Sequence, residues 1–543
     1  MTQKYSQTWI PLLLLVLAIT ALYGQFLWNP IVFDDLYFFM VDNEGNQPVS
    51  NYHFALLELR SLPYATLAWT KDWFGLDLIG FRMGNLVLHA AVVLALFFSL
   101  AALFAAVYGE HGKNELSPRR AAFFAALLFA LHPVATYAAG YLVQRTIIMA
   151  TLFCLLAMLT YVHGSVRQKP LWLWMSVPFY YLAAFSKEHA IMLPAVLLTL
   201  TILLHDDWRT RLKQRWAIFA ALLAIAVFVI MLRGFLGSAY ELNAPEMLRE
   251  TANELAYPLS VITQSWLFFK YVLLWLFPNP AWMSIDMREP FARSLLSPFL
   301  LAFCGFVVWG VGAFWLLLKR GRLGLAGFAM LFPWLMFFTE FAAVRIQEPF
   351  VLYRSYLWAV GAFCLLPALF FRAEARIAMV VLGAIALAML PVSMERLATF
   401  SHPVVLWDDA EKLVKGRADL PGAYRIYYNR GTELIKIDKP DQAIADLKQA
   451  IALSRDFAEG YGNLGAAYFK NEDWQNAVAS FSKAIEIAQS AGKSLTPRYV
   501  YGRGTAYEKM GEMEKAQADY KVSCQLDRRT CDKTRPAPST ILP

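Results

Sequence analysis

Two adjacent carboxylates, Asp34 and Asp35, are the residues of this chain that most directly suggest chemistry. They lie in the stretch LWNPIVFDDLYFF, a few residues after an apolar run long enough to cross a bilayer. Charged side chains beside a membrane are costly and usually have a function. A carboxylate among aromatic rings, with a like charge next to it, has a raised pKa and is a better general base. The pair therefore predicts a base that activates a hydroxyl group.

A structural role for one of these two carboxylates stays open. Asp34 could cap a helix that begins at Asp35, which requires no catalysis. Adjacent side chains point in different directions, so one aspartate can cap a helix while the other faces a cavity. Between the two, the sequence slightly favours Asp35 as the base.

Four further polar clusters lie between apolar runs, at residues 132–145, 186–189, 284–290 and 344–356. A single charged residue at a helix end is usually only a solvated anchor. Several such clusters on one face of a membrane domain instead predict a polar site. The cations in three of them suit a phosphate group, because a guanidinium fork fits phosphate oxygens and an ammonium supplies a point charge.

The composition divides the chain into two parts. Of its 543 residues, 58% are hydrophobic and only 17% are charged, whereas soluble domains carry about 25% charged residues. The apolar excess ends near residue 397. This predicts a membrane domain over 1–397, a linker over 398–423, a soluble domain over 424–535 and a tail over 536–543. The net charge of +8 does not indicate nucleic-acid binding, because the basic residues cluster in short stretches between apolar runs.

The basic clusters also orient the membrane domain. About twelve apolar runs of near-spanning length precede residue 397. The clusters fall on one side only if the run 259–278, which contains Gln264, Ser265 and Lys270, re-enters or lies at the interface. We therefore expect about eleven spanning helices, a cytoplasmic N-terminus and an external C-terminal region. All the polar clusters, including Asp34 and Asp35, then share the external face.

The polar C-terminal region is a repeat. Gly431, Gly465 and Gly504 recur at spacings of 34 and 39 residues, and each is followed twelve residues later by an alanine. The pattern resembles the tetratricopeptide repeat, a helix–turn–helix unit, and three units are about the minimum for a stable stack. Such a stack has a groove lined by the first helix of each unit, which either binds a peptide or protein or packs against the membrane domain. The predicted groove residues are Arg425, Tyr428, Phe469, Arg498 and Tyr501.

Two cysteines in the stretch SCQLDRRTC bear on the compartment of the repeats. Cys524 and Cys531 pair in a disulfide if this region lies in an oxidising compartment, and are otherwise free thiols.

The membrane motifs, taken in order, resemble a known family. FALHPVATYAAGYLVQR, FSKEHAIMLP and the stretch 60–90, which begins RSLPYATLAWTKDWF, are similar to segments of transmembrane O-mannosyltransferases that carry lumenal tetratricopeptide repeats. PNPAWMSID and VLYRSYL match later loops of that family more loosely. The chain departs from the family at two places. It has Tyr137 where the family has Glu, and Gln-Arg-Thr-Ile at 144–147 where the family has Gly-Arg-Ala-Asp. Mannose therefore does not follow as the donor sugar.

The resemblance implies an all-α fold: a polytopic glycosyltransferase bundle of the GT-C type, followed by an α-solenoid of three repeats. Such enzymes transfer a sugar from a polyprenyl-phosphate carrier to an acceptor outside the cytoplasm. In that family a carboxylate of the first external loop is catalytic, which corresponds to Asp34 or Asp35. The donor-phosphate ligands would be Arg145, Lys187 and Arg354, supported by Arg60, His132, Glu188, Glu348 and Tyr353.

The predicted function is transfer of a sugar to a Ser or Thr of a periplasmic protein recruited by the repeats, at a bacterial inner membrane. No nucleotide-binding glycine loop is evident, the sequence identifies no cofactor, and a divalent metal stays open. One alternative is a membrane-anchored scaffold without enzyme activity that assembles envelope or pilus proteins. Another is glycan transfer to a glycolipid.

Overall fold

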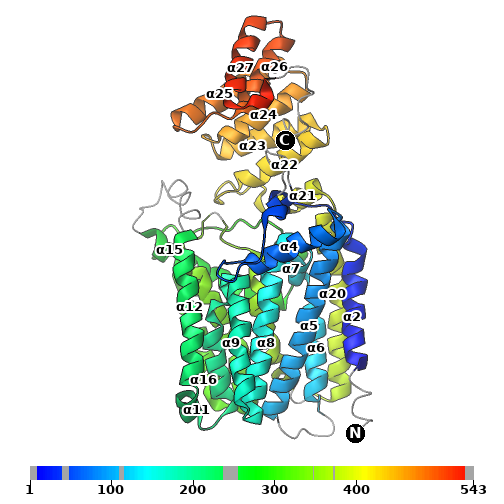
Figure 1. Cartoon of the computed structure of the whole chain (residues 1–543), viewed down its shortest axis with the longest axis vertical. Coiled ribbons are helices and arrows are strands. Elements are labelled where there is room, and N and C mark those ends of the chain that lie inside the picture. The colour runs from blue at the N-terminus through cyan, green and yellow to red at the C-terminus, as the bar shows by residue number, and fades with distance from the viewer. Residues whose placement is uncertain are drawn as a thin grey trace. The chain divides into compact units, whose positions relative to one another are not determined.

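The computed structural model describes residues 9–39, 48–108, 115–236, 255–346, 348–370 and 373–531 (Figure 1). The predicted tail over 536–543 lies outside these residues. The described residues form helices joined by turns and contain no β-strand. The chain forms two compact units, one of residues 1–285 with 291–401 and one of residues 286–290 with 402–543. The predicted all-α class is confirmed.

The first unit is a bundle of apolar helices, several of which run roughly parallel in Figure 1. Within the described residues, eight helices are long and apolar enough to cross a membrane, or up to ten if each of two bent pairs is one span. The sequence predicted about eleven. The helices are α2 (Trp9–Tyr23), α3 (Asp35–Phe39), α4 (Ser61–Phe74), α5 (Leu78–Tyr108), α6 (Pro118–Ala130), α7 (Thr136–Ala139), α8 (Arg145–Arg167), α9 (Pro170–Ser186), α10 (Leu193–Leu204), α11 (Trp208–Gln214), α12 (Trp216–Leu236), α15 (Ala256–Leu276), α16 (Pro298–Lys319), α17 (Gly321–Phe337), α18 (Ser355–Ala362), α19 (Leu366–Leu369) and α20 (Ala375–Ala398).

Helix α15 covers the run that the sequence predicts not to cross the membrane. Its length and hydropathy suffice for a span, and it is one of the eight candidate spans. Ser260 accepts a hydrogen bond from the main-chain N–H of Arg345, and Trp275 donates one to Ser355. These two residues are about 22 Å apart along the helix. Arg345 and Arg354, the neighbour of Ser355, both pair with Glu340.

The segment between α2 and α5 is folded onto the end of the bundle. Helix α4 packs against α5, α8 and α9 and lies crosswise to them (Figure 1). Two non-glycine residues of this segment, Phe33 (φ 53°) and Arg60 (φ 63°), have left-handed backbone conformations. Such conformations are unfavourable for bulky side chains and are often found at functional sites.

The second unit is a stack of helical hairpins. The hairpins pair α22 with α23, α24 with α25 and α26 with α27, and α21 packs on α22 within the stretch predicted as a linker. A Cβ atom at Gly431 would lie 2.9 Å from Leu447, and one at Gly465 would lie 2.8 Å from Phe481. The recurring glycines thus let paired helices approach closely. The bounds are α21 (Pro403–Val414), α22 (Tyr424–Lys436), α23 (Pro440–Leu453), α24 (Ala458–Lys470), α25 (Trp474–Ser490), α26 (Pro497–Lys509) and α27 (Met513–Leu526).

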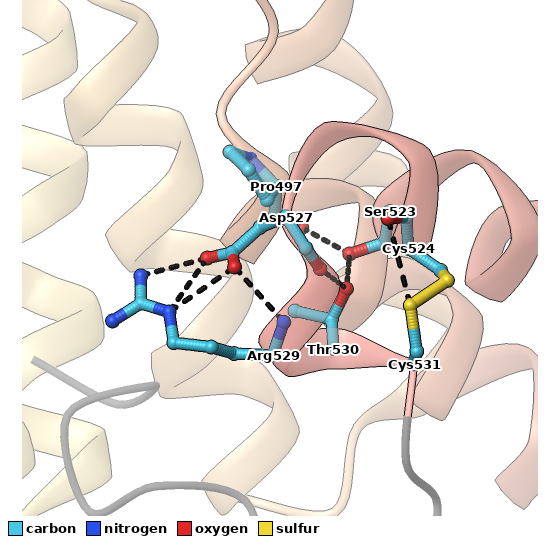
Figure 2. The surroundings of a disulfide bond; sticks show 7 residues. All are labelled: Pro497, Ser523, Cys524, Asp527, Arg529, Thr530 and Cys531. Carbon is cyan, nitrogen blue, oxygen red and sulfur yellow. Dashed lines mark hydrogen bonds and ion pairs between the residues drawn. A yellow bond between two sulfur atoms is a disulfide. The ribbon is translucent and has the colours of Figure 1, made fainter. Parts of the chain in front are cut away.

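A disulfide between Cys524 and Cys531 closes the end of the stack (Figure 2). It joins α27 to the short 3-10 helix η12 (Arg528–Thr530). The hydroxyl of Ser523, next to the disulfide, donates to the carbonyl oxygen of Pro497 at 3.1 Å, which ties this turn to the start of α26. The disulfide therefore restrains the last turn of the solenoid.

Candidate functional site

The two aspartates of the first connecting segment have different surroundings. Asp35 is 1% exposed, and its carboxylate accepts hydrogen bonds from the main-chain N–H groups of Leu142 (3.4 Å) and Val143 (2.9 Å). Burial raises the pKa of Asp35 to about 7, although Arg82 and these two amides oppose the rise. Asp34 is exposed and immediately precedes α3. Its N–H donates to the hydroxyl of Tyr141 at 2.8 Å.

Asp35→Ala is expected to destabilise the protein, because it leaves the amides of Leu142 and Val143 without their acceptor. Buried polar groups that lose their partner cost about 1–3 kcal/mol. A lower melting temperature in detergent, with an unchanged turnover per folded molecule, is the expected result. Unaltered melting together with lost turnover would contradict this structural role for Asp35.

A cluster of charged side chains lies at the same end of the bundle. Arg60 forms a two-pronged ion pair with Glu188, in which its Nε donates at 3.0 Å. Arg354 pairs with Glu340 at 3.1 Å and with Glu348 at 3.3 Å. Buried arginine–carboxylate pairs of this kind hold both partners in a fixed geometry. The charged cluster consists of Arg60, Lys187, Glu188, His189, Glu340, Arg345, Glu348 and Arg354.

Glu340 is the centre of the cluster, and sequence reasoning missed it. Its buried carboxylate contacts His189 at 3.2 Å, Arg345 at 2.8 Å and Arg354 at 3.1 Å. In the sequence it lies at the end of an apolar run, where a charge reads as a solvated anchor. A carboxylate inside the end of a membrane-spanning pattern was the only available signal.

Lys187 is the unusual member of the charged cluster. It is 8% exposed. Among the described residues its ammonium has no hydrogen bond or ion pair, although the charges of Glu188 and Glu348 attract it. Its ammonium lies 5.9 Å from the centre of the Tyr353 ring. Burial, with repulsion from Arg60 and Arg354, lowers the pKa of Lys187 to about 7. An unpaired buried cation is costly, so this position is suited to an anionic ligand.

Aromatic rings connect Asp34 to the cluster. The ring of Tyr141, whose hydroxyl binds the Asp34 main chain, lies 6.4 Å from that of Tyr353. Tyr353 in turn lies under Lys187. The structure therefore brings Asp34, Arg60, Lys187, Glu188, Glu348, Tyr353 and Arg354 to one end of the bundle.

Two predicted members of the site make their hydrogen bonds to other parts of the bundle. Arg145 is 2% exposed, and its guanidinium donates to Asn85, to Thr66, to Thr70 and to the carbonyl oxygen of Phe81. All its donor nitrogens are used, so none is left for a phosphate. His132 is fully buried, with one ring nitrogen 3.0 Å from the Trp275 carbonyl oxygen and the other accepting from the Val134 N–H.

The cluster predicted over 284–290 is also placed differently. Residues 286–290 belong to the second unit, where Arg288 pairs with Asp286 at 2.6 Å. Among the described residues, no three His, Cys, Asp or Glu side chains are arranged to hold a metal ion.

The residues predicted for the repeat groove separate into two groups. Arg498 donates to Asn463 at 3.2 Å, and Asn463 donates to Thr432 at 2.8 Å, so these side chains join the first helices of all three repeats. Tyr428 and Arg425 come from the same first helix as Thr432. Phe469 instead packs on Trp474, and Tyr501 on Tyr520, each a residue of the second helix of its own repeat. The first group forms a hydrogen-bonded path across the stack.

The repeat region and other parts of the chain resemble known proteins. Tetratricopeptide repeat profiles match residues 456–529 and 433–472. The chain is 25% identical over 198 residues to Protein O-mannosyl-transferase F38B6.6 of Caenorhabditis elegans, covering 36% of this chain and 26% of that protein. It is 27% identical over 140 residues to Protein O-mannosyl-transferase TMTC4 of Homo sapiens, covering 24% and 19%. It is 33% identical over 70 residues to the Hsp70-Hsp90 organizing protein of Triticum aestivum, covering 13% and 12%.

These matches confirm the predicted resemblance to O-mannosyltransferases and the presence of tetratricopeptide repeats. The matched segments span about a quarter or less of the length of each of these relatives.

Proposed function

We propose that the chain is a membrane glycosyltransferase that moves a sugar from a polyprenyl-phosphate carrier to a Ser or Thr hydroxyl of a protein held by the repeats. The observation that carries this proposal is Lys187, a buried ammonium without a hydrogen-bonding or ion-pairing partner among the described residues. Through the rings of Tyr353 and Tyr141 it is connected to the exposed Asp34 at one end of an apolar bundle. A lipid-linked phosphate would supply the missing anion, and its sugar would then reach the aspartates.

Asp34 is the base in this proposal, because a general base must come within hydrogen-bonding distance of the hydroxyl it deprotonates. Both oxygens of Asp35 are already bound by amides, whereas Asp34 is exposed. The acceptor oxygen attacks the anomeric carbon while its proton passes to Asp34. The bond between that carbon and the phosphate oxygen breaks, and its electron pair leaves with the lipid phosphate. Lys187 and the Arg60 and Arg354 guanidinium groups stabilise this developing charge.

The location follows from the same proposal. Polyprenyl-linked sugars are used at the external face, so the charged cluster and the repeats would be external and the N-terminus cytoplasmic. A bacterial inner membrane with a periplasmic repeat domain fits an exposed disulfide, since disulfides persist in oxidising compartments. The first-helix surface of Arg425, Tyr428, Asn463 and Arg498 would hold the acceptor.

Binding of the donor is expected to weaken as the pH rises through about 7. Lys187 has a lowered pKa of about 7, so its ammonium is fully charged only below that pH, and the phosphate binds the charged form. Above it, each pH unit should raise the donor KM by up to about tenfold. The measurement is the donor KM from about pH 6 to 9. Lys187→Arg, which stays charged throughout, is the control. A flat profile in the wild-type protein would show that Lys187 does not bind the donor.

The function is tested by incubating the purified chain with a panel of labelled polyprenyl-phosphate sugars. Transfer to a Ser/Thr peptide or protein supports the proposal. Transfer to lipid alone supports the glycolipid alternative. Release or transfer from no donor, while the repeats still capture envelope proteins, supports the scaffold.

A further inference from the structure

Tyr141 contacts both halves of the proposed site, and no part of the mechanism above uses it. It is fully buried. Its hydroxyl accepts the hydrogen bond of the Asp34 N–H at 2.8 Å, and its ring approaches Tyr353, which lies under Lys187. We propose that Tyr141 is a positioning residue that holds the Asp34 carboxylate in its working orientation. This inference rests on the proposed function.

The main chain at Asp34 needs such a restraint. Phe33, immediately before it, has φ 53°, which a bulky residue adopts only when its surroundings impose it. Two contacts of Tyr141 impose it here. The hydroxyl binds the next N–H, and the phenol ring stacks on the Phe33 ring with centroids 6.5 Å apart and planes 21° apart. The direction of the Asp34 side chain therefore depends on where the Tyr141 ring lies.

Tyr141 is itself held in place by contacts with neighbouring residues. The carbonyl oxygens of Tyr141 and Leu142 accept hydrogen bonds from Asn85 at 3.3 and 3.2 Å, and Asn85 is held by Arg145 at 2.7 Å. Phe400 packs on the ring with centroids 6.2 Å apart. Arg145, which the sequence predicts as a phosphate ligand, thus supports the site indirectly. With its ring held in place, Tyr141 can fix the main chain at Phe33 and Asp34 and so keep the Asp34 carboxylate in one orientation.

A structural role and a positioning role for Tyr141 predict different kinetics for the same substitution. If Tyr141 only fills space, Tyr141→Phe keeps the ring and should leave kcat unchanged. If the hydroxyl orients Asp34, the same change should lower kcat and leave the donor KM alone, because Lys187 and the arginines are untouched. Misplacement of a catalytic group by about 1 Å can cost a hundredfold in rate.

The experiment measures kcat, donor KM and melting temperature of the full-length chain for the wild type, Tyr141→Phe, Asp34→Asn and the double variant. Tyr161→Phe is the control, since the buried Tyr161 hydroxyl also binds two groups, Thr201 and Arg215, outside the site. We expect Tyr141→Phe to lower kcat about 10- to 100-fold, with donor KM within about twofold and Tyr161→Phe near wild type. In the Asp34→Asn background the Tyr141 change should have no further effect.

Wild-type kcat in Tyr141→Phe would overturn the inference while leaving the proposed function intact. An equal loss of kcat with and without Asp34 would also overturn it, because Tyr141 would then act independently of that carboxylate. A wild-type chain that transfers no sugar would overturn the proposed function, and this inference with it.

Discussion

Asp34→Asn is expected to lower the rate of sugar transfer by about 10² to 10⁴, the usual cost of removing a general base. Asparagine keeps the size of the side chain and its ability to cap α3, so expression and melting temperature should stay near wild type. The Asp34 N–H still donates to Tyr141, because that bond involves only the main chain. Initial rates with saturating donor and acceptor are the measurement.

Asp35→Asn is the matched comparison for this result. It retains one acceptor oxygen for the Val143 amide, the shorter of the two bonds that Asp35 makes. We expect its transfer rate to remain within a few-fold of wild type. The opposite pattern, with Asp35→Asn inactive and Asp34→Asn active, would show that Asp35 is the base, as the sequence slightly favours. Normal transfer by both variants would show that neither carboxylate is catalytic.

Lys187→Met is expected to weaken donor binding by about 10²-fold, because it removes the cation that would face the carrier phosphate and leaves its volume filled. The same change should leave the melting temperature unchanged or raise it. An unpaired ammonium that is 8% exposed destabilises the fold, and a polar group kept at such a cost commonly serves function. Stability and binding should thus change in opposite directions. Donor binding by the purified chain and thermal melting in detergent are the two readouts.

Lys319→Met is a suitable control for the Lys187 variant. Lys319 is an exposed lysine at the end of α16, where its ammonium lies 4.7 Å from the Trp315 ring centre. We expect no change in donor binding from its loss. If Lys187→Met lowered the melting temperature and left donor binding intact, the ammonium would have a structural role.

The repeats were predictable because their signal is local and periodic. Glycine is needed at 431 and 465 because a Cβ atom there would collide with the side chains of Leu447 and Phe481 in the next helix. That requirement appears in the sequence as a fixed spacing. The groove surface was less predictable. Phe469 and Tyr501 occupy first helices, as expected, but they pack on the second helices of their own repeats. The rotation of each side chain around its helix depends on packing between helices, which spacing alone does not fix.

The polar site was predictable in outline but not in its internal contacts. Lys187, Glu188 and Arg354 stand out in the sequence as charges between apolar runs. The ion pairs of Glu340 with Arg345 and Arg354 depend instead on how the 344–354 segment packs against the end of the preceding helix. Arg145 shows the limit most clearly. A lone arginine at a helix start looks like a surface cation, yet this one is satisfied internally by α4 and α5. Asp34 and Asp35 are adjacent in sequence, and only tertiary contacts with Leu142 and Val143 separate their roles.

The central claim is that this end of the bundle transfers a sugar from a lipid-linked phosphate, with Asp34 as the base. Its most direct test is a time course of label transfer from a panel of polyprenyl-phosphate sugars to a Ser/Thr peptide, comparing the purified wild type with Asp34→Asn. The account predicts transfer by the wild type from at least one donor, and a rate about 10² to 10⁴ lower for Asp34→Asn at equal donor binding. Equal transfer rates for the two proteins, or no transfer by the wild type from any donor, would contradict it.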